Sequence, residues 1–275
     1  RVFLGGEFWA NPMEDWQVRN GWAECLVSSG NRSIHSLCKA LRNADGSFTM
    51  SVRLQKPEGL GKDGGAGFRI GVRSDIDEYR SNCFANGGID AVISGDQLLL
   101  GRDSVKLEKS FDSGECRLVL TGKPGEGPRY ELELTASAPD GTTMGSIVFS
   151  AQKQFVTGNI ALVSQAKLEP KGRKEQASWR FTDWRASGDA LEATPDHRFG
   201  PILWTMYSLS DSRGDEGFVM KLSALTGPLA KSAPQEIELL VEKGGAWQSL
   251  GKESLDSDAW VATFRIPKWD EKSES

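Results

Sequence analysis

Histidine, cysteine and long apolar runs are scarce in this sequence, and each scarcity argues against a class of protein. Only His35 and His197 occur among the 275 residues, too few for the imidazole ligands that a dinuclear hydrolytic metal centre gathers. No apolar run approaches the roughly 20 residues of a membrane-spanning helix. The net charge is −5 and no basic block occurs, which argues against a nucleic-acid partner.

The four cysteines are too few for a disulfide scaffold and fit no CxxC metal pattern. They are Cys25, Cys38, Cys83 and Cys116. Cys25 and Cys38 lie in segments that we predict as neighbouring strands, where a disulfide is compatible with the spacing. Buried free thiols that pack as small apolar side chains are the favoured alternative. The disulfide state stays open at this stage.

Glycine is abundant, with 31 residues, and Gly-Asp, Asp-Gly, Asn-Gly and Gly-Gly pairs separate short runs of Val, Ile, Leu and Phe. In residues 68–73 the alternation is strict, with Phe68, Ile70 and Val72 on one face. A period of two is typical of a half-buried strand. Turn residues at regular intervals between such runs predict an all-β protein.

Two domains are predicted from the spacing of these runs. Residues 1–188 contain about ten to twelve predicted strands and no amphipathic helix, which suits two packed sheets in a jelly roll. Residues 189–201 are polar, include two prolines and are predicted to be a linker. Residues 202–275 contain five or six short strands, which predicts a small immunoglobulin- or fibronectin-like sandwich.

The longest polar loop of the first domain, Ser74–Gly88, is the first place to look for a ligand. Planar donors, an aromatic ring and carboxylates in and beside it suit sugar hydroxyls or a phosphate. These candidates are Arg73, Asp77, Tyr79, Arg80, Asn82 and Asp90. In the favoured alternative, the arginines and aspartates pair with one another and hold the loop in shape. Trp9 is a further candidate, as a ring that stacks on a sugar.

Acidic residues in the same loop are compatible with a calcium-binding site. Asp75, Asp77 and Glu78 cluster oxygen atoms, which calcium prefers, but Arg80 occupies the position of the turn glycine in an EF-hand. A surface salt-bridge cluster is the favoured interpretation, with calcium as an open alternative. No metal-ligand set is predicted.

Glu131 and Glu133 form the one acid pair that invites a catalytic interpretation. Two carboxylates must flank a glycosidic bond for its hydrolysis, and this pair lies on a predicted strand. A third acidic residue is missing near Ala136, and Glu236 and Glu238 repeat the same spacing in the second domain. The repetition favours the alternative that each pair is the solvated face of a strand.

Several framework segments resemble a known family. These are EFWANPMEDWQVRNGWAEC, NRSIHSL, GAGFRIGVRSDIDEYRSNCF, FTDWRASG and RFGPILWTMYSLS. They resemble the region that precedes the catalytic domain in some secreted PhoD-like alkaline phosphatases. The first part is similar to concanavalin A-like (laminin G-like) jelly rolls, and the second to a fibronectin- or Ig-like module. The resemblance implies a secreted or periplasmic parent enzyme that acts on phosphate esters, with its catalytic domain downstream in cis.

The catalytic motifs of that family are absent from this sequence. Neither His35 nor His197 lies in a DxH, GD(N/D) or NHE motif, so no catalytic residue is carried over and no cofactor is predicted. Whether the chain is itself an enzyme stays open. The first hypothesis is a non-catalytic accessory region that binds a glycan or polymer or positions the catalytic domain. The alternatives are a glycan hydrolase that uses Glu131 and Glu133, and a structural spacer.

Overall fold

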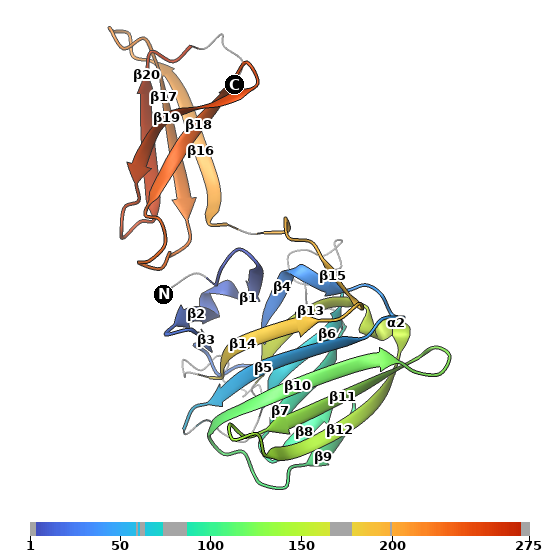
Figure 1. Ribbon diagram of the computed structural model, residues 1–275. Helices are drawn as coiled ribbons and strands as arrows, with labels where there is room; N and C mark the ends of the chain where they lie inside the picture. The colour runs from blue at the N-terminus through green and yellow to red at the C-terminus, as the bar shows by residue number, and fades with distance from the viewer. Residues whose placement is uncertain are drawn as a thin grey trace. The chain divides into compact units, whose positions relative to one another are not determined.

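The computed structural model describes residues 4–58, 60, 64–73, 87–165, 178–198 and 200–270. The chain divides into two compact units (Figure 1). The sandwich unit is Glu7–Arg198, and the small unit combines Arg1–Gly6 with Phe199–Ser275. The described residues include no helix that is long and apolar enough to span a membrane.

The sandwich unit is built from two antiparallel sheets, A and B. Sheet A has the order β1 (Phe8–Asn11), β4 (Arg32–Leu41), β13 (Gly158–Ser164), β6 (Ala66–Val72), β7 (Ile89–Ser94), β8 (Gln97–Leu100) and β9 (Asp103–Lys106), and β15 (Leu191–Ala193) also pairs with β4. Sheet B has the order β12 (Thr143–Gln152), β11 (Arg129–Ser137), β10 (Gly114–Pro124), β5 (Phe48–Lys56), β14 (Arg180–Ser187), β3 (Trp22–Cys25) and β2 (Trp16–Arg19). The described part of the unit also contains two short helices, η1 (Met13–Asp15) and α2 (Lys153–Val156).

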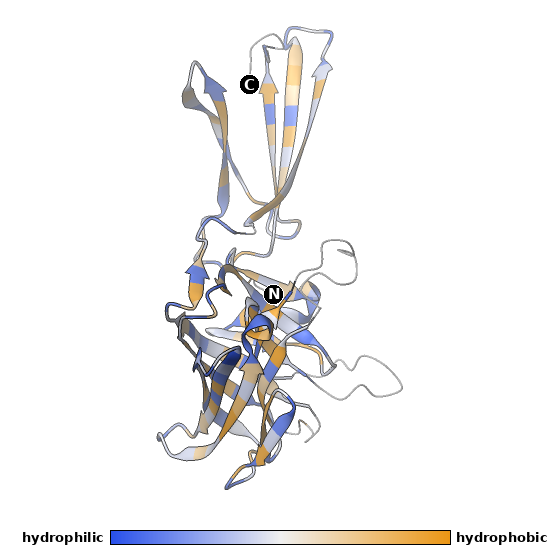
Figure 2. Cartoon of the chain, turned by 90° about the vertical axis from the view of Figure 1, so that its right-hand side faces the viewer, coloured by the Kyte–Doolittle hydropathy of each residue, from blue (hydrophilic) through white to orange (hydrophobic). Residues whose placement is uncertain are grey.

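Alternation along the strands fills the space between the sheets. On β5 the inward-facing Phe48, Met50, Val52 and Leu54 are buried, while Arg53 between the last two is exposed. The bands of polar and apolar colour along the strands in Figure 2 follow this alternation. Burying one apolar face per sheet in this way is what stabilises a two-layer domain. The predicted all-β jelly-roll sandwich is confirmed.

The structure corrects one expectation about neighbouring strands. Cys25 ends β3 of sheet B, whereas Cys38 lies on β4 of sheet A, so the two are not on adjacent strands. Cys25, Cys38 and Cys116 are free thiols, and Cys83 lies outside the described residues. Burial raises the pKa of Cys25 to about 11 and that of Cys116 to about 12, which suits inert packing groups.

Part of the predicted linker is structured. Residues 191–193 form β15 and pair with β4, and the sandwich unit runs to Arg198. After β14 of sheet B the chain turns at Gly188 and crosses to sheet A, where Leu191 lies opposite Leu41 of β4.

The small unit has two thinner layers. One is a three-stranded sheet in the order β16 (Ile202–Asp211), β17 (Phe218–Thr226) and β20 (Val261–Pro267), and the other is the hairpin of β18 (Glu236–Lys243) and β19 (Ala246–Ser254). The hairpin packs against β20. In the described part of the small unit, the buried apolar residues are Val219, Met220, Ala224, Val241, Ala262 and Phe264.

Candidate functional site

Three of the predicted ligand-binding residues fall in the described part of the chain, namely Arg73, Asp90 and Trp9. Asp77, Tyr79, Arg80 and Asn82 lie outside it, as do the acidic residues of the suggested calcium loop. Trp9 is half-buried on β1, opposite His35 of β4. Since β4 and β13 separate β1 from β6, the structure does not place Trp9 beside Arg73.

Asp90 already has protein partners for both carboxylate oxygens. On the neighbouring strand, Arg69 donates from Nε to Oδ1 and from Nη2 to Oδ2, the latter at 3.0 Å. Gln165 donates to Oδ2 at 2.6 Å. A carboxylate that accepts three such bonds holds β6 and β7 in register and has little capacity left for a ligand.

Arg73 instead borders a hollow of about 660 Å³ at the margin of the sandwich. Two further arginines line it, Arg102 in the β8–β9 turn and Arg129 at the start of β11. We call this site the arginine hollow. Phe149 of β12 and Phe155 of α2 add aromatic rings to its wall. Phe155 is 52% exposed, which is unusual for an aromatic side chain of this unit.

Two glycines allow these walls to form. Gly71 has a φ of +70°, and a Cβ at this position would collide with the carbonyl oxygen of Phe155. Glycine therefore lets the α2 segment lie directly on the end of β6. At Gly101, a Cβ would come within 2.8 Å of the Phe149 ring, so glycine also makes room for that ring beneath the turn that carries Arg102.

No direct ion pair neutralises the arginines of the hollow in the described part of the chain, although Glu131 lies close by, hydrogen-bonded to the lining residue Ser150. Within the described ranges, its lining includes no Asp or Glu, and no carboxylate forms an ion pair with Arg73, Arg102 or Arg129. Arg73 donates from Nη2 to the carbonyl oxygen of Gln154, which fixes its direction and leaves other N–H groups available. Three cations around one hollow create a local field that favours an anion.

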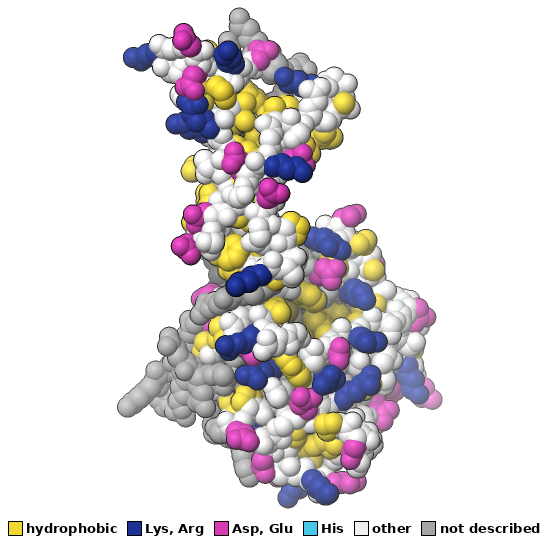
Figure 3. Space-filling view, turned by 60° about the vertical axis from the view of Figure 1, so that its left-hand side comes forward, with side chains coloured by type: hydrophobic (Ala, Val, Ile, Leu, Met, Phe, Trp, Pro, Cys, Tyr) yellow, Lys and Arg dark blue, Asp and Glu magenta, His cyan; other side chains and the backbone are white. Residues whose placement is uncertain are grey.

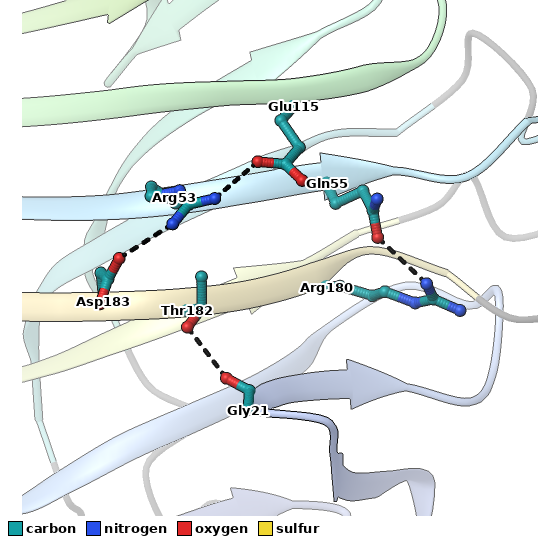
Figure 4. Close-up of polar contacts among 7 residues, drawn as sticks. All are labelled: Gly21, Arg53, Gln55, Glu115, Arg180, Thr182 and Asp183. Carbon is teal, nitrogen blue, oxygen red and sulfur yellow. Dashed lines mark hydrogen bonds and ion pairs between the residues drawn. The ribbon is translucent and has the colours of Figure 1, made fainter. Parts of the chain in front are cut away.

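The arginines on the outer face of sheet B are in a different state (Figure 4). Arg53 donates to Glu115 at 2.7 Å and to Asp183 at 3.2 Å, and its guanidinium lies 5.6 Å from the centroid of the Trp22 ring. Arg180 similarly pairs with Glu24 and Gln55, each at 3.0 Å.

A hydrogen bond from Thr182 to the carbonyl oxygen of Gly21 at 2.9 Å joins the same surface. These groups bind one another across β10, β5, β14 and β3, so this face is a cross-strand network with little free hydrogen-bonding capacity.

The acid pair lies on the exposed face of β11. Glu131 accepts a hydrogen bond from Ser150 at 2.7 Å, and Glu133 accepts one from Ser146 at 3.0 Å. Neither glutamate lines the arginine hollow. The described residues contain no group of three His, Cys, Asp or Glu side chains arranged to hold a metal ion.

His35 is fully buried and structural. Its Nδ1 lies 2.7 Å from Asn159 Oδ1 and its Nε2 lies 2.9 Å from Ser33 Oγ. Burial lowers its pKa to about 4, with the nearby Arg69 charge acting in the same direction. The imidazole is therefore neutral at pH 7 and bridges β4 and β13.

Sequence reasoning missed most of the arginine hollow. Arg102, Arg129, Phe149 and Phe155 belong to four separate elements, and no short motif connects them. The available signal was weak: Arg102 follows a glycine in a turn, and Arg129 follows a Gly/Pro-rich loop. Only the pairing of strands brings them to one margin.

No protein-family model matches the chain, and no curated protein sequence matches it. Among solved structures, lectin II from Ulex europaeus is similar at 14% identity, covering 68% of this chain and 95% of the lectin with a TM-score of 0.45. A Bauhinia forficata lectin in complex with GalNAc has 13% identity, coverage of 66% and 91%, and a TM-score of 0.42.

The exoplasmic/lumenal domain of VIP36, in a Ca²⁺/Man3GlcNAc-bound form, has 11% identity, coverage of 69% and 86%, and a TM-score of 0.42. At these identities and TM-scores, the function of this chain has to be argued from its own residues.

Proposed function

We propose that this chain is a non-catalytic binding module that holds an anionic glycan in the arginine hollow. The observation that carries the proposal is the convergence of Arg73, Arg102 and Arg129 on one hollow, without an ion-pair partner among the described residues. Guanidinium groups bind carboxylates, sulfates and phosphates through pairs of parallel N–H donors. A ligand that brings such groups replaces the water that solvates the three cations.

The aromatic ring beside the cations favours a sugar over a simple anion. Phe155 is 52% exposed and lines the hollow, and an exposed aromatic ring is a group on which the C–H face of a pyranose ring packs. Ser150 and Gln152 add neutral polar groups to the lining: Ser150 Oγ donates to Glu131 and can accept from a sugar hydroxyl, and Gln152 Oε1 accepts from Gln154 while its Nε2 can donate. A sugar that carries a carboxylate or sulfate combines all three kinds of contact in one residue.

The same lining supports binding without bond cleavage. Glycoside hydrolysis requires two carboxyl groups on either side of the scissile bond, and the described residues around the hollow provide none. Glu131 accepts a hydrogen bond from Ser150, a lining residue, but Glu131 itself does not line the hollow.

We place this module upstream of the catalytic domain of a secreted PhoD-like phosphatase or phosphodiesterase. The resemblance of the framework segments, from EFWANPMEDW to RFGPILWTMYSLS, supports this assignment. The complete reading frame tests it: a segment with DxH and NHE motifs is expected after Ser275, and a stop codon there would overturn the assignment.

Binding is tested by calorimetric titration of the full chain with sulfated and uronic-acid oligosaccharides, and with an uncharged gluco-oligosaccharide as reference. We expect the acidic sugars to bind more tightly, with an affinity that falls as salt is added. Replacing Arg102 or Arg129 with alanine is expected to weaken binding by about tenfold or more, because each change removes a charge-assisted contact.

Arg185→Ala is the matched control, since Arg185 is an exposed arginine of β14 that does not line the hollow. Equal loss in the control would show that only overall charge matters. No binding to any acidic sugar would leave the spacer hypothesis in its place.

A further inference from the structure

The first strand of the small unit, β16, is exposed along its whole length. All ten residues of Ile202–Asp211 are classed as exposed, although the segment is rich in large apolar side chains. Met206 is 65% exposed and Tyr207 is 73% exposed. Hydrophobic side chains are visible on the surface of this unit in Figure 3. An exposed apolar strand of this kind indicates an interaction surface.

One hydrogen-bonding edge of β16 is unpaired among the described residues. The strand pairs with β17 on one side, and it ends the three-stranded sheet on the other. Natural edge strands are usually protected by charged residues or proline, and residues 202–210 contain neither. This edge is therefore an unblocked template for another strand.

The other side of the same sheet is protected. Arg265 of β20 makes a bidentate ion pair with Glu216, with both N–O distances at 2.6 Å, and Pro267 ends the strand. The hairpin of β18 and β19 also packs against β20. Of the two edge strands of this sheet, β16 is therefore the one that no charged residue or proline within residues 202–210 protects.

The exposed apolar residues lie on both faces of β16. Because side chains alternate, Trp204 and Met206 point to one face, and Tyr207 and Leu209 point to the other. The second face borders an apolar groove of about 370 Å³, in which Leu222 of β17 lies opposite Tyr207. A flat partner would cover one face only, whereas an added strand provides neighbours on both.

We propose that β16 pairs antiparallel with β16 of a second copy of this chain, about a two-fold axis at Met206. This alignment places Trp204 opposite Ser208 and Thr205 opposite Tyr207, and it brings no like charges together because residues 202–210 are uncharged. A two-fold contact of this type is closed, so it yields a dimer and not a fibre. The inference is independent of the proposed glycan site.

Sedimentation velocity of the full 275-residue chain over a concentration series tests the proposal. The wild type is expected to be a dimer at micromolar concentration. In the proposed dimer, Met206→Lys places two ammonium groups opposite each other. It also removes the two methionine side chains that the dimer would bury, so dimerisation is expected to weaken by on the order of 100-fold. Tyr207→Lys tests the other face in the same way, and Gln248→Lys on exposed β19 is the control that keeps the dimer.

A cysteine variant tests the alignment without adding charge. Met206→Cys is expected to form an intermolecular disulfide on mild oxidation, well above the level in wild type and in Gln248→Cys, which share the same native cysteines. A monomeric wild type at all concentrations would overturn the proposal. A dimer that neither lysine variant weakens would also overturn it. The same holds if hydrogen exchange shows that the backbone amides of β16 are protected by the sandwich unit in a monomer.

Discussion

The two units use the same kind of turn-punctuated strand but differ in how completely they bury apolar side chains. In the sandwich unit, rings such as Phe68 and Trp179 are at most 2% exposed. In the small unit, residues of the same type remain on the surface. Of the eleven large apolar side chains classed as exposed in the described part of the chain, nine belong to the small unit, and the other two are Val148 and Phe155.

The difference follows from the size of the facing layers. In the sandwich unit, two sheets of similar width cover each other's inner faces. In the small unit, a two-stranded hairpin faces a three-stranded sheet and packs against β20, so β16 lacks a covering layer. Small units also bury a smaller fraction of their surface for geometric reasons. Alternation in the sequence thus predicts strands, whereas burial depends on the layer opposite.

The largest expected effect on stability is that of truncating a buried ring in the sandwich unit, compared with an exposed ring in the small unit. Phe68→Ala is expected to destabilise the sandwich unit by about 4 kcal/mol, because it leaves a cavity between packed sheets. Tyr207→Ser in the small unit is expected to change the free energy of unfolding by less than about 0.5 kcal/mol in the monomeric chain, because the ring is already solvated. Urea unfolding at low protein concentration measures both. Similar costs at the two positions would contradict the comparison.

Between pH 7 and pH 5, titration of a buried histidine is expected to destabilise the sandwich unit and not the small unit. His35 is buried in the sandwich unit with a pKa of about 4, against about 6.5 in the unfolded chain, and the small unit contains no histidine. Because the pKa of His35 is lower in the folded state, the folded state is favoured by the neutral imidazole. This stabilisation is present above pH 6.5 and is lost as the pH falls toward 4. Between pH 7 and pH 5 the loss is on the order of 2 kcal/mol.

Thermal unfolding at several pH values checks this prediction. The transition of the sandwich unit is expected to shift with pH, and His35→Gln is expected to remove that part of the shift. His197→Gln is the control, since His197 is exposed. An unchanged pH dependence in His35→Gln would show that other groups are responsible.

Alanine variants at two glycines distinguish the cost of backbone strain from the cost of disturbing the packing around the arginine hollow. Gly71 and Gly141 both have positive φ, +70° and +88°, but only at Gly71 would a Cβ meet the protein. Alanine in a left-handed conformation costs roughly 1–2 kcal/mol at either position. The collision with Phe155 is expected to add about 1–3 kcal/mol at Gly71.

Urea unfolding and titration with an acidic oligosaccharide measure the two consequences. Gly71→Ala is expected to lower both stability and affinity, because the α2 segment with Phe155 must move. Gly141→Ala is expected to lower stability only. If both variants bind equally well, the position of Phe155 is unimportant for binding.

The strands were predictable because their signal is local. Strict alternation over residues 68–73 predicts a strand and Ala66–Val72 is observed, since alternating apolar side chains indicate a half-buried face wherever the strand packs. Strand partnership was not predictable in the same way. The chain passes from β3 in sheet B to β4 in sheet A between Cys25 and Arg32, and no residue in that connection specifies a change of sheet.

The candidate site was predictable only at Arg73. Arg102 and Arg129 join it because the β8–β9 turn and the start of β11 meet at one margin of the sandwich, and this is a consequence of long-range pairing. Asp90 was expected to contact a ligand, but it lies opposite Arg69 and is held by it. A sequence pattern identifies such charged residues without showing which of them neutralise one another.

The smallest effect is expected at the acid pairs, which occur with the same spacing in both units. Glu133 lies on β11 and Glu238 on β18, and each follows another glutamate by two residues. If both pairs are solvated strand faces, Glu133→Gln and Glu238→Gln should each change the free energy of unfolding by less than about 0.5 kcal/mol. Neither should alter the affinity for an acidic oligosaccharide, since Glu133 contacts Ser146 and does not line the arginine hollow. An aryl glycoside panel completes the test: hydrolysis by the wild type that is lost in Glu133→Gln and retained in Glu238→Gln would make the sandwich unit an enzyme and would end its assignment as a binding module.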